Sequence, residues 1–361
     1  MMAFIIISKL IIYLSISILM GSFILSVISP NHKPKVNIKR KYLIMAVLSI
    51  CVFSLTPIFP LIAHLYESMG LQRSTTTVLL TFEIGKALIF TIIIAVFLLL
   101  MLIKINNLKQ PIYSWTGCFL TFLLILGLSW SSHAHSMEQL KGFLIHSVHY
   151  TVISIWMGIL FVVGWFSSDF AKWRQFLKWF TPLAVTCVVM TIGSGLLLMT
   201  VVIDLSQYQN SWPYDYGQLL LWKHLFIIAL LVYAVINGIF IRRRVSTDKN
   251  FNPLPWVKAE SVIGLVILSV TAALGQQSPP SKLGDDTLSK LFSFIYQGQI
   301  ESGMNVDFNV TSLSMFFFFI SIIFIVFIIY SYIKKVPAQV TLLLSILFVL
   351  SGYLALMMSI G

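Results

Sequence analysis

Ten predominantly apolar stretches, each of roughly 20 residues, constrain the fold of this 361-residue chain more than any other feature. A stretch of this length crosses a bilayer as an α-helix, because a helix satisfies its backbone hydrogen bonds internally. Hydrophobic residues make up 58% of the chain and charged residues 10%, which leaves too little polar surface for a soluble domain. We therefore predict an all-α, polytopic membrane helix bundle with spans at about residues 4–27, 43–64, 76–103, 113–130, 142–167, 177–203, 217–241, 257–275, 312–333 and 337–359.

Basic residues predict the orientation of these spans. Of the 24 Lys and Arg residues, seventeen lie in odd-numbered connections and four in even-numbered ones. The positive-inside rule then puts the odd connections in the cytoplasm and both termini outside, and it explains the net charge of +12 without a nucleic acid partner. We expect a multi-pass protein of the cytoplasmic membrane, embedded in the lipid bilayer. Its first span lacks a signal-peptide cleavage pattern, so we expect a retained helix.

Four of the seven histidines lie within residues 129–150. Two of them fall in a polar break, which we expect to be an external loop, and two follow at a spacing of three on one face of the next helix. Imidazole side chains at these spacings are metal-ligand candidates, and a methionine between the pairs would suit a soft ion. We predict a metal site formed by His133, His135, His146 and His149, with Met137 as a supporting residue.

Polar side chains inside the predicted spans are a second signal, because their cost in lipid usually marks function. Alternatives remain open. Glu83 and Lys86 would also fit an ion pair that only holds a helix in place, and Lys223 would also reach the lipid headgroups. His64 and His224 would each also fit a hydrogen-bonded core position. At the cytoplasmic end, the amide of Asn237 and the carboxyl of Glu260 are predicted to form a hydrogen bond. This bond would be either a structural contact or an exit gate for the transported ion. The supporting candidates are His64, Glu83, Lys86, Lys223, His224, Asn237 and Glu260, with Glu83 or Glu260 as a possible proton carrier.

Four short patterns follow one another between about residues 120 and 280. They are Ser132-His133-Ala134, His149 with Trp156 and Gly158, Tyr216-Gly217 leading to Lys223 and Asn237, and Glu260 with Pro279-Pro280. In this order they resemble the CopD family of copper-resistance membrane proteins, which includes importers of the YcnJ type. Ser132 stands where that family usually has glycine, and Met157 and Ile159 interrupt its WxGGL run.

The resemblance implies copper transport across the cytoplasmic membrane, in the direction of uptake, and a role in copper homeostasis and resistance rather than an enzyme activity. It also implies a separate CopC-like external copper-binding protein, since no such module is fused to this sequence. Imidazoles suit Cu(II) and Met137 would favour Cu(I), so both oxidation states stay open. Two alternatives remain: a haem-binding, b-type cytochrome-like oxidoreductase with His149 and either His224 or His64 as axial ligands, and a copper sensor or assembly partner that transports nothing.

These patterns predict four regions of the chain. Residues 1–119 would hold N-terminal transmembrane helices, 120–280 a CopD-like transmembrane core, and 312–361 a C-terminal helix pair. Residues 281–311 would form an external loop with an amphipathic helix, because Leu288, Leu291, Phe292 and Ile295 recur at helical spacing.

Overall fold

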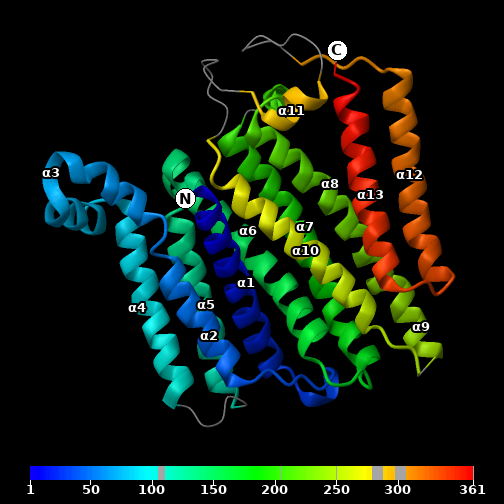
Figure 1. Ribbon diagram of the computed structural model, residues 1–361. Helices are drawn as coiled ribbons and strands as arrows, with labels where there is room; N and C mark the ends of the chain where they lie inside the picture. The colour runs from blue at the N-terminus through cyan, green and yellow to red at the C-terminus, as the bar shows by residue number, and fades with distance from the viewer. Residues whose placement is uncertain (105–109, 204, 249, 279–287, 297–305, 361) are drawn as a thin grey trace. The chain divides into compact units, whose positions relative to one another are not determined.

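The computed structural model describes the chain except for residues 105–109, 204, 249, 279–287, 297–305 and 361 (Figure 1). The described residues form helices, and ten helical stretches are long and apolar enough to cross a membrane. This confirms the predicted polytopic helix bundle with ten spans. The chain divides into two compact units, Met1–Val202 and Ile203–Gly361, which we describe one at a time. Nothing in this division tests the four predicted regions.

Unit 1 is built on α1 and α6, which pack along each other. Helix α1 also packs against α2 and α5, α4 packs against α2 and α5, and α6 packs against α7. A core of buried aliphatic side chains, including Leu19, Ile50 and Leu98, fills the space among them. The helices are α1 (Met2–Val27), α2 (Arg40–Phe53), α3 (Ile58–Leu80), α4 (Glu83–Lys104), α5 (Pro111–Trp130), α6 (His133–Phe166) and α7 (Trp173–Val202), with a short 3₁₀ turn at Pro30–His32.

The second predicted span differs from a single straight helix. It is split between α2 and α3, and Pro57, which lacks an amide hydrogen, precedes the first residue of α3. Helix α3 then continues to Leu80 through residues predicted as a connection, with a kink at Gly70, where φ is 71°. Most of its side chains are exposed, and in Figure 1 it bends away from α2 and α4.

The predicted loop around His133 is wrong in its local structure, because α6 already begins at His133. The Ser132 side chain caps this turn by accepting a hydrogen bond from the His135 amide at 3.3 Å. Non-helical dihedrals at Glu138 and Gln139 then separate the turn from the rest of α6. The turn folds back onto Gly142, where a Cβ atom would lie 1.8 Å from the Ala134 carbonyl oxygen. Only glycine permits this approach.

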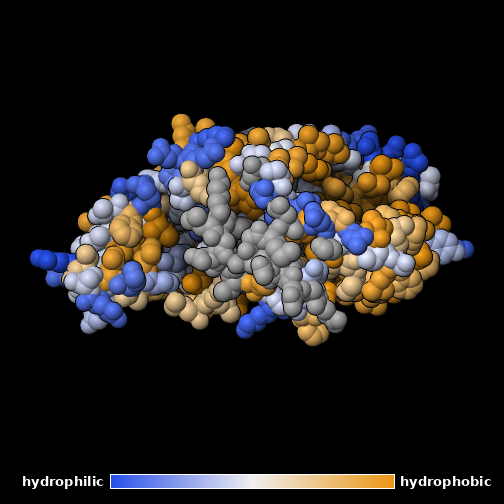
Figure 2. All heavy atoms as spheres, turned by 90° about the horizontal axis from the view of Figure 1, so that it is seen from above, coloured by the Kyte–Doolittle hydropathy of each residue, from blue (hydrophilic) through white to orange (hydrophobic). Residues whose placement is uncertain are grey.

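Unit 2 packs α10 and α13 against α8, and α12 against α13. Exposed apolar side chains such as Phe316, Phe319 and Val326 cover α12, as expected for a helix that faces lipid. Figure 2, a view from above, shows hydrophobic residues in orange on the surface. Its elements are η2 (Leu205–Gln207), η3 (Gln209–Ser211), α8 (Asp215–Val235), a π-helical turn η4 (Ile236–Ile241), α9 (Arg242–Thr247), α10 (Leu254–Leu274), α11 (Lys290–Ile295), α12 (Ser312–Ile333) and α13 (Ala338–Met357).

Part of the predicted external segment can be compared with the structure. Helix α11 lies within it, and of its apolar residues Phe292 is buried whereas Leu291 is exposed. Pro279, Pro280 and residues 281–287 and 297–305 lie outside the described residues, so the rest of that prediction stays open.

Candidate functional site

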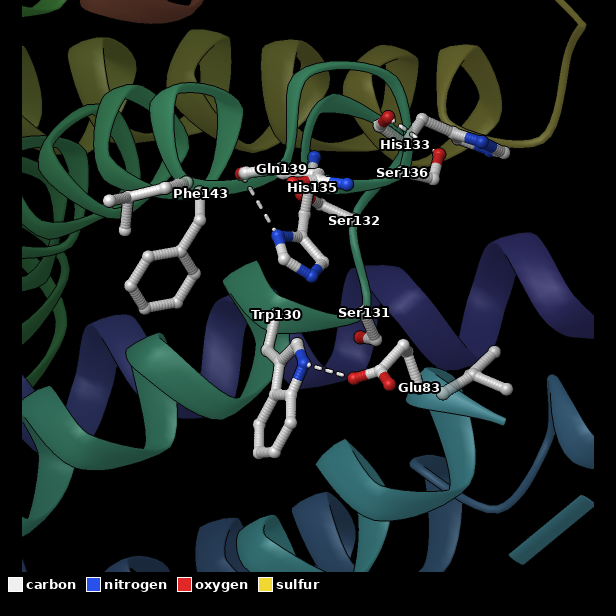
Figure 3. Close-up of a pocket in the computed structure, with 11 residues that line it drawn as sticks. Glu83, Trp130, Ser131, Ser132, His133, His135, Ser136, Gln139 and Phe143 are labelled. Atoms are coloured by element: carbon white, nitrogen blue, oxygen red, sulfur yellow. Dashed lines mark hydrogen bonds between the residues drawn. The ribbon is translucent and has the colours of Figure 1, made fainter. Parts of the chain in front are cut away.

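A pocket of about 730 Å³ opens in unit 1 where three helix ends meet. These are the start of α4, the end of α5 and the first turns of α6 (Figure 3). The residues that line it are mostly polar and include two of the predicted histidines. They are Glu83, Ile84, Trp130, Ser131, Ser132, His133, His135, Ser136, Gln139, Leu140 and Phe143.

A backbone hydrogen bond fixes the ring of His135 in the pocket. Its Nδ1 lies 2.9 Å from the carbonyl oxygen of Gln139, whose φ of 40° turns the backbone at the break in α6. A carbonyl oxygen can only accept, so Nδ1 carries the hydrogen and the lone pair is on Nε2. In Figure 3 the ring points towards Trp130. A backbone partner that fixes the tautomer in this way is typical of metal-ligating histidines.

Glu83 supplies the negative charge of the pocket. One carboxylate oxygen pairs with Lys86 Nζ at 2.9 Å, and the other accepts a hydrogen bond from Trp130 Nε1 at 2.8 Å. The Glu83 side chain is 54% exposed, and an ion pair in this setting contributes little free energy. His135 lines the same pocket as this carboxylate. The Glu83 carboxylate can therefore exchange Lys86 for another partner at a small cost in free energy.

His133 lines the pocket, and Met137 follows it in the first turns of α6. His133 is the first residue of α6 and is exposed, and in Figure 3 its ring points away from that of His135. The Met137 side chain is 49% exposed. Both side chains are therefore accessible from solvent at this end of unit 1.

His146 and His149 follow on α6, but their rings bind different neighbouring helices. His146 Nδ1 lies 2.9 Å from Ser129 Oγ on α5, and His149 Nδ1 lies 2.9 Å from Ser194 Oγ on α7. Ser194 donates its own hydrogen to the Met190 carbonyl at 2.5 Å. It therefore accepts from His149, and the His149 lone pair is on Nε2, as in His135.

The remaining supporting candidates lie elsewhere. His64 is exposed on α3. Lys223 and His224 lie on α8 in unit 2, so their predicted share in a common cavity with the other histidines stays a prediction. His224 Nδ1 lies 2.7 Å from the Tyr208 hydroxyl. Burial raises the pKa of Tyr208 to about 12, so this phenol keeps its proton near neutral pH.

Asn237 and Glu260 meet in unit 2, as their predicted pairing requires. Asn237 Nδ2 donates to Glu260 Oε2 at 2.6 Å, and both side chains are buried.

Sequence reasoning missed the groups that orient the histidines. Ser129 and Ser194 are ordinary small residues within apolar spans, and only the packing of α6 between α5 and α7 gives them a role. Trp130 ends an apolar span, and its indole binds Glu83. The Gln139 carbonyl becomes available because the helix breaks there. The Gly193-Ser194-Gly195 run was a usable signal, since Gly195 lies against the His149 ring.

In the part of the chain that the structure describes, no three side chains of His, Cys, Asp or Glu converge on one point for a metal ion. The rings of His135, His146 and His149 are instead bonded to three different elements. A single site that uses all four histidines therefore stays a prediction.

The Ser194 hydroxyl gives a first test of this geometry. Ser194→Ala removes the acceptor that holds His149 Nδ1–H, and loss of such a partner typically weakens metal binding about 10- to 100-fold. We expect a decrease in the copper affinity of the purified protein of about tenfold, the lower end of that range. Ser147→Ala is the matched control, because the Ser147 hydroxyl donates to Phe143 of its own helix. An equal effect of both substitutions would contradict this role for Ser194.

Two family descriptions match the chain. Residues 174–274 match Copper resistance protein D, and residues 1–143 match Copper resistance protein D-like, N-terminal domain. Together the two matches span more than half of the sequence. No curated protein and no solved structure matches it.

Proposed function

This chain belongs to the copper resistance protein D family, and from that membership we propose that it carries copper ions across the cytoplasmic membrane into the cell. Membership in this family gives the protein a role in copper handling, and its ten apolar helices make it a multi-pass membrane protein. The transport step, its direction and the residues that bind the ion are the parts that we propose.

The orientation of His135 is the observation that carries the proposal. Its Nδ1 hydrogen is held by the Gln139 carbonyl, and the ring faces a polar pocket that also contains a carboxylate. Among divalent first-row ions, copper binds imidazole ligands most tightly. His133 would add a second imidazole on moving its side chain, and Met137 would favour the reduced ion. Glu83 and Lys86 would set the charge of the pocket.

His146 and His149 would serve as the next copper-binding sites along α6. An ion that must leave again is best bound in steps of moderate strength rather than in one tight site. The separate serine partners of these two rings suit such a sequence of binding sites. Copper would then pass from the pocket to His146 and on to His149.

Electrostatics favours uptake over release. A cation that enters a negative interior gains about 2.3 kcal/mol per charge per 100 mV, and the sequence contains no Walker motif that would supply energy from a nucleotide. The basic connections would face the cytoplasm, which leaves the His133 turn and both termini outside. A separate CopC-like protein would deliver copper to that turn.

Metal content and absorption of the detergent-purified protein provide the first test. We expect copper near one ion per chain and no Soret band, and we expect the copper to disappear in the His135→Ala/His149→Ala double variant. His32→Ala is the matched control, since this exposed histidine lies outside the pocket. A Soret band, or copper that survives the double substitution, would refute the proposed site. Copper uptake into vesicles with an imposed negative interior would then test transport and its direction.

A further inference from the structure

Unit 2 contains a buried carboxyl group that the proposed histidine site does not use. Glu260 on α10 is 2% exposed and Asn237 on η4 is 7% exposed. Asn237 Nδ2 donates to Glu260 Oε2 at 2.6 Å and lies 3.4 Å from the Trp256 carbonyl oxygen. The carboxyl is therefore held by a neutral amide inside a span. An acid kept at such a position is expensive and usually functional, because a glutamine would fill the same space without the cost.

The Asn237 side-chain amide has an acceptor atom that its hydrogen bond to Glu260 does not use. Asn237 Oδ1 is buried and has no hydrogen-bond partner among the described residues, an arrangement that native proteins rarely tolerate without a purpose. Half a turn about the Cβ–Cγ bond would exchange the amide oxygen and nitrogen, which are nearly equal in size. The side chain could then donate to a carboxylate in one orientation and accept from a carboxylic acid in the other.

The backbone around Asn237 differs from an ordinary helix. Residues 236–241 form a π-helical turn at the end of α8, and such turns are frequent at functional sites. Among the described residues, the titratable and charged groups near this level include Tyr233 of α8, Tyr332 of α12, Arg244 of α9 and the exposed Lys258 of α10. The Tyr233 hydroxyl donates to Thr341 on α13 at 2.7 Å, and the Tyr332 ring packs on Trp256. Arg244 lies over the Tyr332 ring, 5.9 Å from its centroid.

We propose that Glu260 is a proton-binding site that couples proton movement to ion transport, and that Asn237 holds the carboxyl in both protonation states. The carboxylate takes up one proton and becomes neutral, and its new O–H donates to Asn237 Oδ1 after the amide turns. Release of the proton restores the carboxylate and the Nδ2 donor. Only the coupling rests on the proposed copper transport; proton binding by Glu260 does not.

Infrared difference spectroscopy on protein reconstituted in lipid tests proton binding without any copper. A pH step should produce the C=O stretching band of a buried carboxylic acid in the wild type, and Glu260→Gln should remove it. Asn237→Leu keeps the acid but removes its partner, so the band should shift in frequency. Tyr353→Phe is the matched control, because it deletes another buried hydrogen bond of unit 2, that to Gln218, and should leave the band unchanged. Two results would overturn the inference: a carboxylic acid band that is still present in Glu260→Gln, or a band whose frequency does not change in Asn237→Leu.

Vesicles loaded with a pH-sensitive dye test the coupling. Copper added outside should change the internal pH in step with copper uptake. Glu260→Gln should reduce the proton flux to that of protein-free vesicles while copper binding to the purified protein stays intact. An unchanged proton flux in Glu260→Gln would refute the coupling. If the wild type takes up no copper but its infrared band still titrates, the proposed transport fails and the proton site stands.

Discussion

Replacing His135 by alanine is expected to lower copper affinity at least about 100-fold, as measured by competition with a chelating dye on purified protein. Loss of a residue that only orients a ligand already costs about 10- to 100-fold, so loss of the ligand itself should cost no less. The same variant should reduce copper uptake into vesicles in proportion. The fold should survive, because His135 is only half-buried and lies in a short turn at the start of α6.

His32→Ala controls for the loss of a histidine elsewhere in unit 1, and its affinity should equal that of the wild type. His135→Gln should behave like His135→Ala, since an amide fills the space but is a poor copper ligand. If His135→Ala binds copper as tightly as the wild type, the ring serves only to close the turn through its bond to Gln139. The pocket would then have to bind copper through His133 or not at all.

The number and approximate limits of the spans could be predicted from the sequence because they depend on local physics. A helix crosses a bilayer when roughly 20 residues in a row are apolar, whatever its neighbours are. The whole of α12, SLSMFFFFISIIFIVFIIYSYI, satisfies this condition by itself. The partnership of Asn237 and Glu260 was also accessible, because consecutive spans of known direction bring their ends to a similar depth.

The limits of α3 and the start of α6 could not be predicted by the same reasoning. The limits of α3 depend on Pro57, which precedes its first residue, and on the kink at Gly70. The start of α6 depends on Ser132, which caps the first turn, and on Gly142, which lets that turn fold back. A polar run such as residues 131–141 looks like a loop when hydropathy is the only criterion. Capping and close backbone contact make it helical.

The directions of the histidine rings were beyond the sequence for a different reason. A spacing of three places His146 and His149 about 60° apart around α6, which predicts one shared face. Helix α6 packs against both α5 and α7, however, and each ring meets a different serine. Which helices flank α6 is a property of the whole bundle. The spacing of the histidines therefore could not predict how their rings divide among partners.

Gly21→Leu is expected to have the largest effect on stability, because it acts on the contact between α1 and α6. A Cβ atom at Gly21 would lie 2.2 Å from the carbonyl carbon and oxygen of Gly158, and one at Gly158 would lie 2.1 Å from the Ser17 carbonyl oxygen. Backbone atoms cannot rotate aside as side chains do, so the two helices must separate. We expect a loss of more than about 3 kcal/mol, the upper end for overpacking, seen as a lower thermal unfolding midpoint in detergent.

Gly193→Ala on α7 is the matched control, since no atom lies within 4 Å of a Cβ placed there. Alanine at a helical position with free space is neutral or stabilising by up to about 1 kcal/mol. Because α6 bears His135, His146 and His149, Gly21→Leu should also lose copper binding, but together with the fold. His135→Ala should lose copper binding and keep the fold. If Gly21→Leu unfolds at the wild-type temperature, α1 and α6 do not meet at these glycines, and the orientation of α6 that presents its histidines would need another explanation.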